Sequence, residues 1–420
     1  MSLRTRIRDF SSLVQLQAPA LPTTASALHA ARDIGDVREL ARRRTPRFVF
    51  DYVDGGSFRE ESVAYNQTAF AGHRFAPRVL RPVGQPDLSA ELLGGRTKLP
   101  IGLAPTGLTG LSHPEGEKAV ARAAAAFGVP FSVSTMATSS IEDVAAAAPD
   151  SRRWFQLYLR TDRAKSLDLI RRALNHGYES LVLTVDTAVA GRRLRDDRNG
   201  LALPPKLRVD TFFDTARHPG WALRFLANGA PKLANFSEST NSISELVSSM
   251  FDPQLSFDDL DWLREQWPKN LIIKGVLHPD DARTAFDHGA DAVWVSNHGG
   301  RQMDRTVAPI DVIAEIRAAV GPHRPLILDS GIRSGLDVAA ALAAGADFVH
   351  VGRAFLYGLM AGGQPGVERV LQILSDETRN AMQLLGAATI TDLRQGQLHA
   401  PLCMNLDQYP EDSVLNKRTA

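Results

Sequence analysis

The chain has 420 residues, of which 44% are hydrophobic and 23% are charged. This composition is typical of a globular protein with enough apolar material for a large core. Basic and acidic side chains nearly balance, 48 against 47, and the net charge of +1 provides no field that would gather nucleic acid. We therefore exclude the strongly basic nucleic-acid-binding classes and expect no nucleic-acid partner.

Three sequence features bear on the cellular compartment. A single cysteine, Cys403, excludes an intramolecular disulfide and fits a reducing compartment. Residues 1–22 carry basic side chains but no sustained apolar core, which argues against a cleaved signal peptide. No run approaches the roughly 20 apolar residues that cross a bilayer. We expect a cytoplasmic protein.

Regular elements can be predicted from residue 34 onward. Residues 34–44 predict a helix, and residues 46–56 predict a capping segment that stops at a Gly-Gly pair. Further along, short apolar runs rich in Val, Ile, Leu and Phe alternate with Ala-rich helical segments. The runs occupy residues 100–107, 130–137, 153–159, 180–186, 270–276, 292–299, 325–332 and 348–355. Because they lack strict alternation, they are typical of strands buried on both faces.

Eight strand–helix units in succession predict an α/β fold, a closed parallel (β/α)8 TIM barrel with an N-terminal helical cap. A doubly wound open sheet has the same rhythm, but the number of units favours closure. The long interval between the fourth and fifth runs predicts an insertion over about 188–255. We therefore expect an N-terminal arm (1–33), a barrel domain (34–398) and a C-terminal tail (399–420).

Barrel enzymes carry their chemistry at the carboxyl ends of the strands. Nearly every predicted strand here ends in a group that can form hydrogen bonds or carry charge. These groups are Thr106, Gly107, Ser134, Thr135, Gln156, Tyr158, Thr184, Asp186, Lys274, Ser296, His298, Arg301, Asp329, Gly331, Arg333, Gly352 and Arg353. Without a ligand such groups would be left unpaired, so we expect a binding site at this end.

The last two strands predict a phosphate site. The stretches DSGIRSG and VGRAF place glycines together with Arg333 and Arg353 where barrels commonly hold a phosphate. Glycine lets backbone N–H groups approach oxygen atoms closely, and arginine supplies paired donors. Tight turns with surface arginines are the alternative interpretation.

His298 is the candidate proton acceptor. It follows a strand, precedes Gly299 and Gly300, and lies three residues before Arg301. An imidazole beside a guanidinium suits a base next to an anchored carboxylate, and Asp186 is the natural group to orient the ring.

Four further residues keep more than one interpretation on spacing alone. Lys274 is a Schiff-base nucleophile, a charge stabiliser for a cofactor or a member of a structural ion pair. Arg193 is either a clamp for an anionic substrate or a surface arginine. Tyr52 and Tyr158, taken singly, are more simply explained as core tyrosines with satisfied hydroxyls.

The stretch SNHGGRQMD resembles the active-site signature of the FMN-dependent L-2-hydroxy acid oxidising enzymes. That family includes glycolate oxidase, lactate oxidase, flavocytochrome lactate dehydrogenase and the bacterial membrane-associated lactate and mandelate dehydrogenases. The resemblance extends from about residue 34 to about residue 398, through FDYVDGG, LAPTG, HPEGE, WFQLY, LTVDT, IKGV, LDSGIRSG and VGRAFLYGLMAGG. It implies FMN as the cofactor and no metal.

The resemblance also implies a role for each matched residue. The implied FMN contacts are Pro105, Thr106, Gly107, Ser134, Gln156, Thr184 and Ser296 around the ring, Lys274 beside ring N1, and Asp329, Ser330, Gly331, Arg333, Gly352 and Arg353 along the ribityl chain and phosphate. The implied substrate residues are Arg193 and Arg301 as a carboxylate clamp, Tyr52 and Tyr158 as hydroxyl donors, His298 as the catalytic base and Asp186 as its partner.

The implied reaction oxidises an L-2-hydroxy acid to a 2-oxo acid, with L-lactate as the first expectation and mandelate-type acids as the alternative. Gly107, Met136 and Val53 depart from the alanine, tryptophan and tyrosine of some relatives, and the first two imply room for a larger substrate side chain. The implied electron acceptor is a quinone or another respiratory carrier, with oxygen as the alternative. A non-redox FMN isomerase, a lyase acting through Lys274 and a non-catalytic barrel are more distant alternatives.

The insertion is similar to the membrane-attachment segment of the bacterial lactate and mandelate dehydrogenases over FFDTARHPGWALRFLANGAPKLANF. This similarity implies peripheral contact with the cytoplasmic face of the inner membrane through about 205–236; a lid or a subunit contact is the alternative. The resemblance further implies a homo-oligomer.

Overall fold

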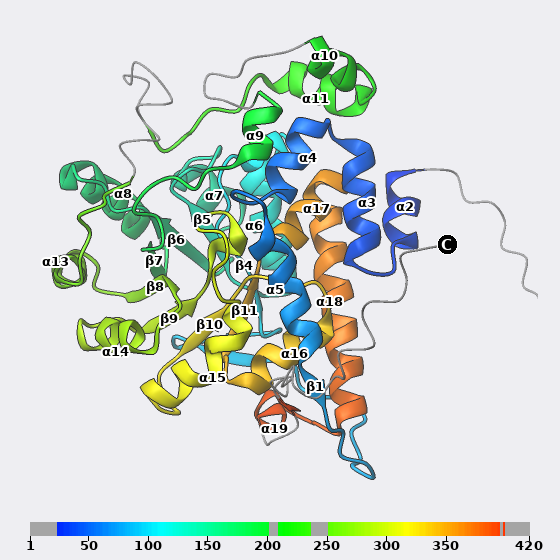
Figure 1. Ribbon diagram of the computed structural model, residues 1–420. Coiled ribbons are helices and arrows are strands. Elements are labelled where there is room, and N and C mark those ends of the chain that lie inside the picture. The colour runs from blue at the N-terminus through cyan, green and yellow to red at the C-terminus, as the bar shows by residue number, and fades with distance from the viewer. Residues whose placement is uncertain (1–22, 201–208, 237–250, 395–397, 400–420) are drawn as a thin grey trace, which may run out of the picture.

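The computed structural model describes residues 23–200, 209–236, 251–394 and 398–399. At its centre lies a closed barrel of parallel strands in which neighbours follow chain order and the last strand returns to the first (Figure 1). The strands are β4 (Ile101–Leu103), β5 (Phe131–Ser134), β6 (Arg153–Leu157), β7 (Ser180–Thr184), β8 (Asn270–Val276), β9 (Ala292–Val295), β10 (Leu326–Leu328) and β11 (Phe348–Val351). All eight predicted strands and the closure of the barrel are confirmed, and the open-sheet alternative is wrong.

Helices surround the barrel and cover its outer face. They are α6 (Gly116–Phe127), α7 (Ile141–Ala147), α8 (Arg163–Asn175), α13 (Asp258–Gln266), α14 (Pro279–Asp287), α15 (Pro309–Val320), α16 (Gly335–Ala344), α17 (Arg353–Gly362) and α18 (Gln364–Leu385). Local signals place their ends: the Ser334 side chain caps α16, and Gly128 ends α6 in the left-handed conformation at φ 61°. None of the described helices is long and apolar enough to span a bilayer.

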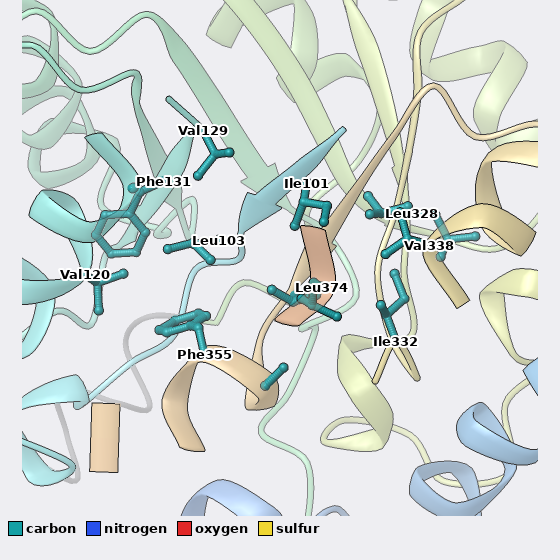
Figure 2. Packing of buried hydrophobic residues seen from close by; sticks show 14 of the residues in the cluster. Ile101, Leu103, Val120, Val129, Phe131, Leu328, Ile332, Val338, Phe355 and Leu374 are labelled. Carbon is teal, nitrogen blue, oxygen red and sulfur yellow. The ribbon is translucent and has the colours of Figure 1, made fainter. Parts of the chain in front are cut away.

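The strands bury both faces, as their continuous apolar runs predict. Outward-facing side chains such as Leu103 and Phe131 pack against helix residues such as Phe355, and Figure 2 shows part of this outer cluster. Inward-facing Trp154 and Trp294 fill the barrel with a smaller cluster of their own. The interior is therefore a packed core, which confines any ligand to the ends of the barrel.

The N-terminal cap precedes the barrel. It consists of α2 (Thr24–Ala30), α3 (Ile34–Arg44), α4 (Arg47–Asp54) and α5 (Glu61–Gly72). The predicted helix over residues 34–44 is confirmed, and the predicted capping segment is itself a helix, α4, which ends at Gly55. The helix α2 lies inside the predicted arm (1–33), and its buried Leu28 packs against Gly362 of α17.

The remaining elements are short. They are β1 (Arg74–Phe75), β2 (Ala90–Leu92), β3 (Gly95–Thr97), the single-turn helices η1 (Thr109–Leu111) and η2 (His298–Gly300), α9 (Leu194–Arg198), α10 (Val209–Ala216), α11 (Pro219–Asn228), α19 (Ile390–Leu393) and β12 (Leu398–His399). The helices α9, α10 and α11 belong to the predicted insertion (188–255), of which 201–208 and 237–250 lie outside the described residues.

The predicted domain boundaries are only partly covered by the structure. His399, where the predicted tail begins, pairs with Arg74 of β1. Residues 1–22 of the predicted arm and 400–420 of the tail lie outside the described residues. The division into arm, barrel and tail stays a prediction.

One close helix contact generates a stability prediction. The helices α17 and α18 approach each other through Gly358 and Gly366, and a Cβ atom at Gly366 would overlap the Gly358 carbonyl oxygen. We expect Gly366→Ala to destabilise the fold by about 1–3 kcal/mol, because the backbones must separate. Thermal unfolding should show a lower melting temperature. The control is Gly84→Ala, which adds a methyl group with no atom within 4 Å; equal melting temperatures would contradict the prediction.

Candidate active site

The carboxyl ends of the strands open into one large cavity. Its empty space is about 1280 Å³ when counted out to the open solvent. The predicted site residues that line it are Tyr52, Pro105, Thr106, Gly107, Ser134, Gln156, Tyr158, Thr184, Arg193, Lys274, His298, Arg301, Asp329, Ser330, Gly331, Arg333, Gly352 and Arg353. The structure thus brings together residues that are up to 301 positions apart (353 − 52).

Two predicted site residues, Asp186 and Ser296, do not line the cavity and instead support residues that do. Ser296 accepts a hydrogen bond from Lys274 Nζ at 2.8 Å. Lys274 also forms an ion pair with Asp329 at 3.2 Å and is almost fully buried. Lys274 thus forms an ion pair and also lines the cavity, so its role toward a cofactor stays a prediction.

Asp186 supports His298. The Asp186 Oδ1 atom lies 3.0 Å from His298 Nδ1. Burial raises the pKa of Asp186, but the nearby His298 and Lys274 side chains lower it, and the net pKa lies below its ordinary 3.8. The carboxylate is therefore ionised. Because it occupies Nδ1, the other ring nitrogen, Nε2, is left for a ligand in the cavity.

The backbone around His298 is arranged to aim the imidazole. His298 has φ 57° and Gly299 has φ 63°, both left-handed, so the strand end turns sharply here. A Cβ atom at Gly299 would lie 2.7 Å from Arg353 Nη1, which explains why this position requires glycine. The Ser296 hydroxyl accepts the His298 N–H at 3.0 Å and fixes the turn.

Two arginines line the cavity together with Tyr52. The guanidinium carbons of Arg193 and Arg301 lie 5.9 and 4.9 Å from the centre of the Tyr52 ring. Arg301 donates to the Tyr52 and Gly55 carbonyl oxygens, at 2.6 and 3.1 Å. Burial and the charge of Arg193 lower the pKa of Arg301. Two partly buried cations around one ring favour an anionic ligand between them.

Tyr158 lies near Tyr52 and the two arginines. Burial, together with the negative charge of Asp186, raises the pKa of Tyr158, so its phenol is protonated and can donate a hydrogen bond. The Phe251 ring packs against it edge to face at 5.8 Å. Tyr158 lines the cavity, so its position does not need to be explained by a structural role in the core.

Two buried polar atoms that line the cavity at the strand ends have no hydrogen-bond partner among the described residues. These are Gln156 Nε2 and Thr184 Oγ1, and both are buried. Gln156 is held in place through Oε1, which accepts from Ser134 Oγ at 3.1 Å and from Thr135 N at 3.2 Å. Leaving such groups unpaired is costly, so the site is suited to a ligand with complementary polar edges.

The predicted phosphate end has one unexpected feature. Arg353 donates to three carbonyl oxygens, those of Val53, Gly299 and Gly55, at 3.1, 2.8 and 2.7 Å. Burial lowers the pKa of Arg353 to about 10. Arg353 therefore fastens the cap to the barrel, and its contact with a phosphate stays a prediction. Arg333 and the first turn of α17 also face this end of the cavity.

The structure adds residues that the sequence interpretation missed. They are Thr187, Ala190, Phe251, Gln302, Ile332, His350, Val351 and Leu356. Gln302 directly follows Arg301, so the stretch SNHGGRQMD could have identified it as a site residue. Its side-chain amide donates to the Asp186 carbonyl oxygen at 3.3 Å and accepts from the Gly191 N–H at 3.0 Å. Phe251 lies near the end of the insertion (188–255), and no sequence pattern placed it here.

His350 is the most unusual of these residues. It faces the barrel interior, with its ring centre 4.1 Å from that of Trp294, and neither ring nitrogen has a partner among the described residues. Burial and the charge of Lys274 hold the pKa of His350 well below its ordinary value, so the ring is neutral. Alternation along β11, in which Phe348 also faces inward, was the signal that could have found it.

Comparisons with known proteins agree with this geometry. A family model described as FMN-dependent dehydrogenase matches residues 41–400. A protein of Mycobacterium tuberculosis, provisionally named as an L-lactate dehydrogenase, is 45% identical over 388 residues, or 92% of this chain and 94% of that protein. The (S)-mandelate dehydrogenase of Pseudomonas putida is 40% identical over 391 residues, or 92% of this chain and 98% of that protein.

A solved structure supports the same assignment. The crystal structure described as the monotopic membrane protein (S)-mandelate dehydrogenase superposes with a TM-score of 0.85 at 40% identity, and the match covers 88% of this chain and 100% of that chain. The matches extend over nearly the whole barrel, including every strand end that lines the cavity. The chain therefore belongs to the FMN-dependent dehydrogenase family.

Proposed function

We propose that the cavity at the mouth of the barrel binds FMN and an L-2-hydroxy acid side by side. As a member of its family, the chain is an FMN-dependent L-2-hydroxy acid dehydrogenase. The observation that carries the residue assignments is the convergence of Arg193, Arg301 and His298 on one cavity. Two guanidinium groups bind a carboxylate, and an imidazole beside them takes a proton.

The described residues fit FMN. The unpartnered Gln156 and Thr184 groups suit the carbonyl and nitrogen edge of a flavin ring, and Lys274 adds a positive charge beside them. Arg333 and the first turn of α17 suit the phosphate. We assign the remaining contacts to Pro105, Thr106, Gly107, Ser134, Asp329, Ser330, Gly331, Gly352 and Arg353, with Ser296 acting through Lys274. Bound there, FMN supplies the acceptor for two electrons.

The substrate is held by its carboxylate and oxidised at its hydroxyl-bearing carbon. Arg193 and Arg301 fix the carboxylate, and the Tyr52 and Tyr158 hydroxyls donate to the substrate oxygens. His298 Nε2 takes one proton, and Asp186 stabilises the charged imidazole that results. Two electrons leave with the oxidation, and positioning supplies much of the rate. These positions fit both a hydride-transfer mechanism, in which His298 takes the hydroxyl proton, and a carbanion mechanism, in which it takes the proton on the α-carbon.

We propose L-lactate as the first substrate and mandelate-type acids as the second. The provisional name of the M. tuberculosis relative supports the first, and the P. putida relative supports the second. Met136, Ala190 and Phe251 add apolar side chains to the lining of the cavity, which suits a substrate side chain larger than hydrogen. We propose a quinone or another respiratory carrier as the electron acceptor, with oxygen as the alternative.

We propose that α10 and α11 contact a membrane surface. Phe212 and Phe213 are 71% and 60% exposed, and Leu223 and Leu226 are also exposed. Apolar side chains among basic ones are suited to the boundary of a bilayer, and the solved relative is described as a monotopic membrane protein. Residues 205–208 of the predicted contact segment lie outside the described residues. Location on the cytoplasmic face and homo-oligomerisation stay predictions.

The first test concerns the base. We expect His298→Gln to retain bound yellow FMN but to lose turnover by about 10²–10⁴-fold, because no group then accepts the proton. Absorbance of the purified variant and steady-state rates measure the two effects. The control is His278→Gln, which changes a solvent-exposed histidine. Full activity of His298→Gln would overturn the assignment.

A second test concerns the reaction. We expect anaerobic L-lactate to bleach the flavin absorbance, and D-lactate to leave it unchanged, because the arginine clamp and His298 lie on fixed sides of one cavity. Repeating the titration with (S)-mandelate ranks the two substrate classes. Comparing reoxidation by oxygen with reduction of an artificial dye ranks the acceptors. A protein that binds FMN but bleaches with neither acid would contradict the proposed function.

A third test concerns the membrane. We expect the protein to sediment with vesicles that contain anionic lipid, and Phe212→Ser combined with Phe213→Ser to reduce the sedimented fraction several-fold. The control is Leu384→Ser on α18, which also changes an exposed apolar side chain. If the unaltered protein stays wholly in the supernatant, the proposed membrane contact is wrong.

A further inference from the structure

Arg195 is the centre of a partly buried cluster of charges between α9 and the N-terminal cap. Its guanidinium lies 3.1 Å from Asp54 and 3.4 Å from Asp51, and it also bonds Glu60. The two aspartates belong to α4, whereas Arg195 belongs to α9. The cluster therefore joins the start of the insertion to the cap, and the two helices lie next to each other in Figure 1.

The helix α9 depends on such contacts. It has five residues, and no side chain caps its N-terminus; a helix this short is unstable by itself. Apart from Arg195, its described hydrogen bonds to the cap are those of Asn199, whose amide donates to Asp51 at 2.7 Å, and of the Arg192 carbonyl, which accepts from Phe58 N at 2.8 Å. Arg195 therefore supplies the charged part of this attachment.

The same helix α4 also holds the other side of the site. Tyr52 lies on α4, and its carbonyl oxygen accepts from Arg301 at 2.6 Å. The Gly55 carbonyl oxygen, just after the helix, accepts from both Arg301 and Arg353. One short helix thus contacts Arg301 directly, and it contacts the segment that bears Arg193 through the Tyr52 ring and through Arg195.

The Asp54 carboxylate of the cluster keeps its negative charge at neutral pH. Burial raises the pKa of Asp54, but its bonds to Arg38, Tyr357 and Arg195 lower it, to about 2 overall. A carboxylate with so low a pKa stays ionised well below neutral pH. Without Arg195, three neighbouring carboxylates, those of Asp51, Asp54 and Glu60, would lose a shared positive partner. Because α9 would then lose its ion pairs with the cap, it could move away from α4.

We infer that Arg195 is a positioning residue: it ties α9 to α4 so that Arg193 stays at the distance from Arg301 that a substrate carboxylate requires. The inference rests on the proposed function, because it assumes that Arg193 binds the carboxylate. Arg193 directly precedes α9, and its Nε donates to Asp196 on the same helix at 2.7 Å. A shift of α9 therefore carries Arg193 with it.

The test compares Arg195→Met and Arg195→Lys with a matched control, Arg264→Met. Arg264 forms an ion pair with Asp291, and its side chain is 29% exposed, against 31% for Arg195. The control therefore reports the loss of an ion-paired arginine of similar exposure at another place. Asp291 immediately precedes β9, at the end of the barrel opposite the cavity.

We expect Arg195→Met to raise KM for the L-2-hydroxy acid about 10-fold or more, because small displacements of a positioning group are costly, and to change kcat less. Oxalate is a carboxylate that cannot react, and its binding is measured from the change that it causes in the flavin spectrum. Its dissociation constant should rise by a similar factor. Arg195→Lys should restore part of both. FMN content should not change, and Arg264→Met should change only the melting temperature.

Parallel measurements on Arg193→Met separate the two hypotheses. If Arg193→Met leaves KM and oxalate binding unchanged, the proposed role of Arg193 fails. If Arg193→Met weakens both but Arg195→Met behaves like Arg264→Met, the positioning role of Arg195 alone is overturned. Should Arg195→Met fail to fold, Glu60→Gln, which removes one of the three carboxylates, is measured against the same criteria.

Discussion

Buried positive charge at one end of the barrel is the constraint around which the site is organised. Lys274, Arg193, Arg301 and Arg353 all line a single cavity. Moving cations out of water is costly unless each has partners. Lys274 is paired with Asp329 and Arg193 with Asp196, whereas Arg301 and Arg353 bond backbone carbonyl oxygens. The cavity is thus electropositive before any ligand binds, which suits an anionic cofactor and an anionic substrate.

The way these cations are held determines which of them face a ligand. Carbonyl partners satisfy a guanidinium without neutralising it, so Arg301 keeps its full charge while its position is fixed. Lys274 is different, because its carboxylate partner lies within the same barrel and offsets part of the charge. Asp186 is likewise set back behind His298, where it orients the ring without occupying space that a substrate needs. The site therefore separates the groups that contact ligands from those that support them.

The helix α4 connects these requirements to the rest of the fold. It contributes Tyr52 to the cavity, its carbonyl oxygens to two arginines and its carboxylates to Arg195. Its N-terminal end also meets the surface helices, through the bond from Arg47 N to Asp214 and the edge-to-face contact of Phe48 with Trp221. The cap is consequently part of the site, and the barrel alone would lack one wall of the cavity.

The eight strands, the closure of the barrel and the positions of most site residues followed from the sequence. Doubly buried strands need continuous apolar runs, and strand ends in a barrel share one rim, so local pattern and topology sufficed. The His298–Asp186 pairing was predictable for the same reason, although 112 residues separate the two (298 − 186). Tertiary structure alone decided that Arg353 bonds cap carbonyls, that Phe251 lines the cavity, and that Arg195 meets three carboxylates. These contacts depend on how the cap and the insertion pack against the barrel. Such packing between distant segments produces no repeating pattern in the sequence from which it could be predicted.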